Sequence, residues 1–192
     1  MYASSLPRFT PSRAPLRSAR LTLRPYLPSD ADAFFQLIDE DRPRLQPAFP
    51  TREMSVQTPA DAAQVLRMFA QDWTSGRLYV LGIWHTQTQA YLGDISLKPN
   101  WTKPVTVEIG YYLAASAEGQ GYAREALHAV LAFGFTTLEA SRLLIRCRAD
   151  NPRSCAVAEA AGFVPVPPRP RLLRAFTDQT ILYYIRKREE HP

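Results

Sequence analysis

The stretch TVEIGYYLAASAEGQGYAREALHAVLAFGFTTL, residues 106–138, shows the clearest change of pattern in the chain. Residues 106–113 alternate, which predicts a strand with Val107, Ile109, Tyr111 and Leu113 on one face and Thr106, Glu108, Gly110 and Tyr112 on the other. Residues 122–138 carry apolar side chains at helical spacing, which predicts a helix with inward-facing Ala126, Leu127, Val130, Leu131 and Phe135. Residues 114–121 therefore connect a strand to a helix.

Two glycines in this connection, Gly119 and Gly121, indicate a loop that binds phosphate. Glycine lets the backbone turn tightly and approach a ligand closely, and the free amides at a helix N-terminus attract anions. The pattern therefore predicts a pyrophosphate cradle, with a plain strand-to-helix turn as the alternative. A P-loop is excluded because no Gly-Lys-Ser/Thr follows, and a Rossmann fingerprint is disfavoured because its third glycine is missing.

A second pattern, NPRSCAVAEAAGF at residues 151–163, follows a predicted strand over residues 143–148. Asn151 suits the N-cap of a short helix, Pro152 suits its first turn, and Gly162 suits its end. Helix formation explains these three residues fully. It explains Ser154 less well, because a serine in the first turn is merely permitted.

The other segments predict further strands at residues 21–24, 78–84, 91–97 and 179–186. Helices are expected to begin near Ser29, as a capping box with Asp32, and at Thr58. Pro99 and Pro104 are expected to bound a loop. The order is one strand, two helices, three strands, then helix, strand, helix and strand, which predicts an α/β (α+β) fold with a central mixed sheet.

The length of 192 residues predicts one domain, residues 21–188, after a basic, proline-containing arm at residues 1–20. The sequence contains no apolar run long enough to cross a membrane and no apolar stretch after the N-terminal arginines, so we expect a cytoplasmic protein without a secretory signal. Two cysteines, Cys147 and Cys155, are too few for a disulfide framework or a zinc site. None of His85, His128 and His191 has a ligand partner at helical spacing, so no metal is predicted.

The net charge of +5 suggests a nucleic-acid partner, but its distribution argues against one. Five arginines and no acidic residue lie in residues 1–24, so 18 basic groups in the rest of the chain are balanced by 18 acidic groups. We therefore expect no direct contact between the body of the protein and nucleic acid. The arm is expected to be a solvated tail, with an extended arm that docks on the body as the alternative, and any contact with a polyanion would belong to it.

Together, the two motifs resemble the GNAT superfamily of acetyl-coenzyme A-dependent N-acetyltransferases. Residues 108–113 and 118–127 resemble its strand and acyl-CoA pyrophosphate loop, and residues 151–163 resemble its second motif. The segments LTLRP at 21–25 with Asp30, and LGDI at 92–95, are similar to the ribosomal-protein N-terminal acetyltransferase (Rim-type) branch. The resemblance spans about residues 20–187, and it implies a GNAT fold whose central twisted sheet is mixed but mostly antiparallel, with flanking helices.

The resemblance implies acetyl-CoA as cosubstrate. The residues that it assigns to acyl-CoA are Leu113, Ala115, Gly119, Gln120, Gly121, Tyr122, Ala123, Arg124 and Asn151. The backbone amides near Leu113 would polarise the thioester carbonyl, because the sheet of this family splays apart there. Glu118 departs from the family loop, which usually has Gln, Arg or an aromatic residue there, and we expect it to point to solvent.

Two residues are implied in catalysis by direct attack of an amine on the thioester. Glu108 is the candidate base, with a structural cross-strand pair as the alternative interpretation. The resemblance to the Rim-type branch implies Ser154, three residues after Asn151, as the acid that protonates the leaving thiolate. The tyrosine that many other members use is replaced here by Ala158, and Tyr111 and Tyr112 are the other candidates. Cys155 invites a covalent mechanism, but we expect it to pack in the interior.

The predicted function is acetylation of a protein N-terminal α-amine. The alternatives are acetylation of a small amine (an aminoglycoside, polyamine or amino acid) and a non-catalytic module that binds acyl-CoA or nucleic acid. The acceptor pocket would lie between residues 40–58 and the loop after Leu97, where Trp101 would either line it or cover the edge of the core. No membrane partner is expected, and the chain is expected to be a monomer or a homodimer.

Overall fold

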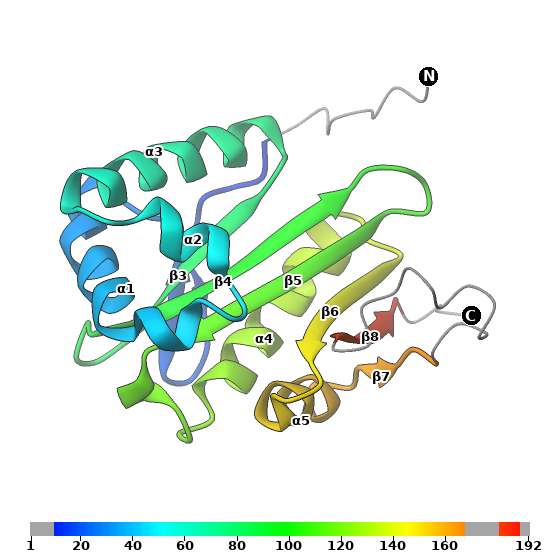
Figure 1. The fold of residues 1–192 in the computed structure, drawn as a ribbon. Coiled ribbons are helices and arrows are strands. Elements are labelled where there is room, and N and C mark those ends of the chain that lie inside the picture. The colour runs from blue at the N-terminus through cyan, green and yellow to red at the C-terminus, as the bar shows by residue number, and fades with distance from the viewer. Residues whose placement is uncertain (1–9, 168–180, 189–192) are drawn as a thin grey trace.

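The computed structural model describes residues 10–167 and 181–188. Its strands form one sheet in the order β1-β2-β3-β4-β5-β6-β8-β7, shown in Figure 1. Their bounds are β1 Leu16–Arg17, β2 Leu21–Arg24, β3 Tyr79–His85, β4 Tyr91–Asn100, β5 Thr106–Leu113, β6 Arg142–Arg148, β7 Val164–Pro165 and β8 Ile181–Lys187. Among the described strands, only β5 and β6 pair in parallel, and the other neighbours are antiparallel, which confirms the mixed, mostly antiparallel sheet.

Helices cover the two faces of this sheet (Figure 1). Their bounds are α1 Ala31–Leu45, α2 Pro50–Ser55, α3 Pro59–Ser75, α4 Tyr122–Ala132, which continues as a π-helical turn Phe133–Thr137, and α5 Pro152–Ala160. Short 3₁₀ turns lie at Pro28–Asp30 and Ala115–Ala117. The helix expected to begin at Thr58, the helix over residues 122–138 and the short helix between Asn151 and Gly162 are confirmed within one or two residues of the expected ends.

Alternation along the strands divides the buried side chains into two clusters. On β3, Val80 and Trp84 pack with the smaller cluster under α1 and α3, whereas Leu81 and Ile83 join the larger one, which includes the buried face of α4. On β5, Ile109 belongs to the α4 cluster and Tyr112 to the α1 cluster. The predicted period of two therefore sets which residues of β5 are presented to each side.

Local signals place α3 where the sequence predicts it. The Thr58 hydroxyl accepts from the amide of Asp61, and the Asp61 carboxylate accepts from the amide of Thr58. Gly76 ends the helix at a φ of 69°, in the left-handed region that favours glycine. Trp101 donates its indole hydrogen to the carbonyl of Gly76 at 2.9 Å and packs on the larger cluster, so it covers the edge of the core.

Two predicted boundaries are wrong. The Ser29 side chain makes no capping hydrogen bond to α1. Instead, the Asp30 carboxylate accepts hydrogen bonds from the amide of Leu27 and from both terminal nitrogens of Arg24. Strand β4 also continues through Pro99 to Asn100, where a loop was expected. Pairing with β3 ends at Leu97, so Pro99 lies on a locally one-sided edge where its missing amide hydrogen is tolerated.

The described part of the N-terminal arm is packed on the body, so the expectation of a solvated tail is wrong for residues 11–20. The backbone of β1 pairs with β2 through Leu16 and Arg17. The indole of Trp73 donates to the carbonyl of Pro11 at 3.1 Å, and the Arg13 guanidinium donates to the carbonyl of Ala70 on α3.

Candidate active site

The site begins where β5 and β6 separate. Their parallel pairing covers residues 106–109 against residues 142–145. Beyond it, β5 continues to Leu113 along β4, and β6 continues to Arg148 along β8. The amide of Ala114 donates to the carbonyl of Leu92 on the β4 side at 2.8 Å, so alternation turns the Leu113 amide toward the opening between β5 and β6. This opening is called the splay below.

A loop of residues 114–121 leads from the splay to α4. Gly119 and Gly121 have φ values of 75° and 81°, so both need the left-handed conformation that glycine adopts readily. No side chain caps α4, whose N-cap is Gly121. The first amides of a helix have no partner within it, so the backbone of residues 121–124 suits an anion such as a pyrophosphate.

Ala115 differs from the other predicted loop residues. Its amide donates to the Asp41 carboxylate of α1 at 2.9 Å, so this hydrogen is already bonded within the protein. Asp41 is almost fully buried and also pairs with Arg44 at 2.6 Å. The contact attaches the start of the loop to the end of α1.

Glu118 does not point freely to solvent, contrary to the expectation from the sequence. Its carboxylate pairs with Arg44 from α1 and, at 2.9 Å, with Arg153 from α5. Two helices on opposite faces of the sheet are thereby joined through this loop residue.

Arg20 also reaches the loop, although the sequence analysis assigned it to the arm. Its guanidinium donates to the carbonyl of Gln120 at 3.1 Å, pairs with Glu125 and lies over the Tyr122 ring. Partial burial alone would raise the pKa of Glu125, but hydrogen bonds from Ser18 and Arg20 lower it below its ordinary value. The arginine at the end of the arm thus holds the N-terminus of α4.

Ser154 lies on the α4–α5 side of the sheet beside β5. Asn151 caps α5 by accepting from the amide of Ser154 at 3.1 Å, as the sequence predicts. The Ser154 hydroxyl lies 3.2 Å from the Tyr111 hydroxyl and 3.4 Å from the Cys147 sulfur. Burial raises the pKa of Tyr111, and burial together with the nearby Cys155 raises that of Cys147 to about 11, so both are protonated at neutral pH.

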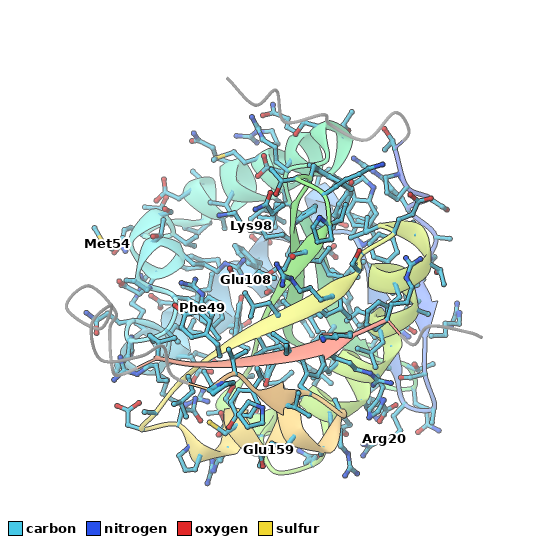
Figure 2. The ribbon with its side chains drawn as sticks, turned by 90° about the vertical axis from the view of Figure 1, so that its right-hand side faces the viewer. Arg20, Phe49, Met54, Lys98, Glu108 and Glu159 are labelled. Atoms are coloured by element: carbon cyan, nitrogen blue, oxygen red, sulfur yellow. The ribbon has the colours of Figure 1, made fainter. Side chains whose placement is uncertain are left out.

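Glu108 lies on the opposite face of the sheet. Its carboxylate pairs with Arg146 of β6 at 2.7 Å, and Lys98 is its register partner on β4. Figure 2 shows Phe49, Glu108 and Lys98 in one row between α2 and β6. A Cβ built at Gly110 would lie 3.6 Å from the Phe49 ring, so Phe49 covers this part of β5. The ion pair between Glu108 of β5 and Arg146 of β6 is the structural cross-strand pair that was the alternative interpretation of Glu108.

A buried ionic cluster near this face was not predicted. Arg52 of α2 pairs with Asp94 of β4, and the Tyr26 hydroxyl donates to Asp94 at 2.9 Å. Burial alone would lower the pKa of Arg52, but Asp94 raises it, so the guanidinium stays charged. It also lies 5.3 Å from the centre of the Tyr112 ring. Because α2 is only one and a half turns long, sequence periodicity could not reveal it.

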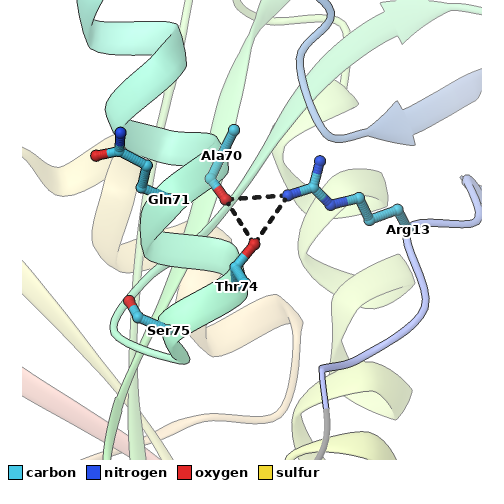
Figure 3. A pocket seen from close by; sticks show the side chains of 5 residues that line it. All are labelled: Arg13, Ala70, Gln71, Thr74 and Ser75. Atoms are coloured by element: carbon cyan, nitrogen blue, oxygen red, sulfur yellow. Dashed lines mark hydrogen bonds between the residues drawn. The ribbon is translucent and has the colours of Figure 1, made fainter.

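Other features of the described residues lie away from this site. A shallow depression of about 450 Å³ is lined by Arg13 and by residues of α3 (Figure 3). Its Thr74 and Ser75 hydroxyls donate to carbonyls of the same helix. Within residues 10–167 and 181–188, no three His, Cys, Asp or Glu side chains are grouped to hold a metal. No helix of this part of the chain is long and apolar enough to cross a membrane. His191 lies outside the described residues.

Comparisons with known proteins agree with this arrangement. The Acetyltransferase (GNAT) domain model matches residues 20–164. The ribosomal-protein-serine acetyltransferase of Escherichia coli (strain K12) is 44% identical over 59 residues, which are 31% of this chain and 33% of that protein. The match thus spans a third of that relative's length. The uncharacterized N-acetyltransferase YoaA of Bacillus subtilis (strain 168) is 27% identical over 148 residues, 77% of this chain and 81% of that protein.

A solved structure described as RimL, the ribosomal L7/L12 alpha-N-protein acetyltransferase in complex with coenzyme A, has the same fold. Its TM-score is 0.74 at 23% identity, over 91% of this chain and 98% of that one. The family match covers more than half of the sequence and includes the strand, the loop and α5 that form the site. The expected family is confirmed: this chain belongs to the GNAT family of acetyltransferases.

Proposed function

We propose that this protein transfers the acetyl group of acetyl-CoA to the N-terminal α-amine of a protein. The splay carries the proposal, because within the described part of the chain the Leu113 amide has no backbone partner there, between an uncapped helix N-terminus on one side and Glu108 on the other. The relatives named as ribosomal-protein acetyltransferases support a protein acceptor. The CoA complex of a structural neighbour supports the acyl donor.

Acyl-CoA would bind along the α4–α5 face. The amides of residues 119–124 would hold the pyrophosphate, and Asn151 would hold the pantetheine arm with the amide nitrogen that its capping contact leaves free. The loop residues fit this role because both glycines are left-handed and, among the described residues, no side chain makes a capping hydrogen bond at the start of α4. The thioester would then lie in the splay, where the Leu113 amide stabilises the carbonyl oxygen as it gains charge.

The amine would approach from the face that carries Glu108. Glu108 would accept its proton, directly or through a water, so that the neutral amine attacks the thioester carbon. The bond between carbon and sulfur then breaks, and the thiolate takes a proton from Ser154. The Tyr111 hydroxyl, 3.2 Å away, would stabilise the serine as it loses that proton. The nitrogen of the intermediate, which carries one proton more than the product amide, gives that proton up, and it restores the Ser154 hydroxyl, so that the amide and the free thiol result.

Two measurements test this proposal. Acetyl-CoA at 100 times its Kd should add about 2.7 kcal/mol to the free energy of unfolding, which thermal melting detects. Thiol release should then be followed with N-terminal peptides, polyamines, amino acids and aminoglycosides. Turnover confined to peptides supports the proposal. Turnover confined to small amines would contradict a protein acceptor and show that the acceptor is a small amine. No melting shift with acetyl-CoA would contradict the whole proposal.

A further inference from the structure

Glu118, an acidic residue in the loop proposed to bind the pyrophosphate, has no role in the proposed function. Glu118 stands immediately before Gly119, and both of its carboxylate oxygens are bonded to arginines. Arg44 comes from the end of α1 and Arg153 from the first turn of α5. The three residues are called the ion bridge below.

The ion bridge links both faces of the sheet at the end of the splay. Helix α1 packs on the face of Tyr112, and α5 packs on the face of Tyr111. Glu118 directly precedes Gly119, so its carboxylate holds both guanidinium groups at the end of the loop, and a Cβ built at Gly119 would meet nothing within 4 Å, which leaves space beside the loop backbone. An anion bound by the loop amides would therefore lie within reach of Arg44 and Arg153.

The charges of the ion bridge are balanced in the absence of a ligand. Arg44 also pairs with Asp41, so two guanidinium groups face two carboxylates. The side chains of Arg153 and Glu118 are 83% and 36% exposed, and pairs so open to water are weak and easily exchanged. Arginine binds phosphate through two parallel hydrogen bonds, as it binds a carboxylate.

We propose that Glu118 acts as an internal anion that the phosphates of acyl-CoA displace. In the free protein it holds Arg44 and Arg153 at the loop, and on binding these arginines move to the ligand phosphates. Glu118 thereby weakens acyl-CoA binding and favours release of the CoA product. This inference rests on the proposed function, since it assigns partners to the phosphates of the same donor.

The test compares coenzyme A with pantetheine, which lacks the phosphates, by calorimetric titration of the full chain. Glu118→Gln should lower the Kd of coenzyme A roughly two- to fivefold, the change that corresponds to one exposed ion pair. The Kd of pantetheine should not change. Arg153→Gln should raise the Kd of coenzyme A and, combined with Glu118→Gln, should remove most of the gain. The differences should shrink at high salt.

Asp72→Asn is the matched control, because Asp72 pairs with Arg77 at the far end of α3 and its loss removes the same charge. It should leave the Kd of coenzyme A unchanged. An unchanged or higher Kd in Glu118→Gln would overturn the inference while leaving the proposed function intact. So would an equal gain in Asp72→Asn, which would reflect net charge alone. Failure of the wild-type protein to bind coenzyme A would contradict the proposed function and this inference together.

Discussion

At the residue scale, two hydroxyl-bearing side chains and one carboxylate flank the splay from opposite faces. Ser154 and Tyr111 lie on the α5 side, and Glu108 lies on the α2 side. Their separation follows from β5 itself, because residues 108 and 111 differ by an odd number and face opposite ways. The two proton transfers of an acetyl transfer would thus be assigned to different faces.

Replacing the serine tests its part in the reaction. Ser154→Ala should lower kcat about 10²-fold, the contribution of a positioned acid, while the Kd of acetyl-CoA stays nearly constant. Stopped-flow thiol release and calorimetry measure the two quantities. Cys155→Ala, which alters the adjacent packed residue, serves as the control. Normal turnover in Ser154→Ala would exclude this hydroxyl from the mechanism and leave Tyr111 as the candidate.

The test of Glu108 must distinguish a role as general base from a role as the structural partner of Arg146. Glu108→Gln should abolish the acidic limb of the pH profile of kcat/KM, because the glutamine cannot accept the amine proton. Arg146→Gln breaks the same ion pair and retains the carboxylate, so it should keep that limb. If both variants have the wild-type profile, the pair between β5 and β6 is structural only.

At the element scale, the short helix α2 is held by charge and aromatic contacts more than by its own length. Arg52 enters the interior beside Asp94, whose side chain is 1% exposed, and stacks near Phe49, Phe69 and Tyr112. A six-residue helix is not stable alone. The buried pair therefore fixes α2, and with it Phe49, over the face of Glu108.

Removing one partner of that pair should be severe. Arg52→Leu leaves the Asp94 carboxylate buried without its cation, so the free energy of unfolding should fall by about 3–5 kcal/mol. Urea unfolding measures the loss. Arg77→Leu breaks the pair between Asp72 at the end of α3 and the largely exposed Arg77 that follows the helix, and it should change stability by less than about 1 kcal/mol. A loss below about 1 kcal/mol in Arg52→Leu would show that α2 does not depend on the pair.

Acid should loosen the contact between the arm and α4. The pKa of Glu125 is lower in the folded protein than in the unfolded chain, so its contribution to stability is present above the unfolded value. It is lost as the pH falls through the folded value. Hydrogen exchange at Ser18 and Arg20 should therefore speed up, relative to the core strands, in acid. Glu125→Gln should show the fast exchange already at neutral pH; a variant that still changes with pH would rule out Glu125 as the cause.

At the scale of the whole molecule, the sequence predicts the parts that depend on local pattern. The alternation of residues 106–113, the helix start at Thr58 and the Asn151 cap all place their elements correctly. What it missed depends on distant contacts. Glu118 meets Arg44 and Arg153, and Arg52 meets Asp94, over separations that no local pattern encodes. The docking of the arm through Trp73 and Pro11 is of the same kind.

The arm gives a test at this scale. A chain that begins at residue 10 keeps β1 and the Pro11, Arg13 and Ser18 contacts, whereas one that begins at residue 19 loses them. The shorter chain should melt several degrees lower and bind coenzyme A more weakly, because the start of α4 loses the Ser18 hydrogen bond to Glu125. Equal melting and binding of the two chains would show that the arm is dispensable.

The opening between β5 and β6 also bears on the order in which the two substrates bind. If the proposed function holds, the donor would approach the splay along α5 and the acceptor would approach it past α2, on opposite faces of the sheet, so neither would block the path of the other. Random-order sequential kinetics are the natural outcome, and competitive inhibition between CoA and acceptor is not. A large protein acceptor could stay bound on one face while CoA is exchanged for acetyl-CoA on the other. Successive turnovers would then not require the acceptor protein to dissociate first.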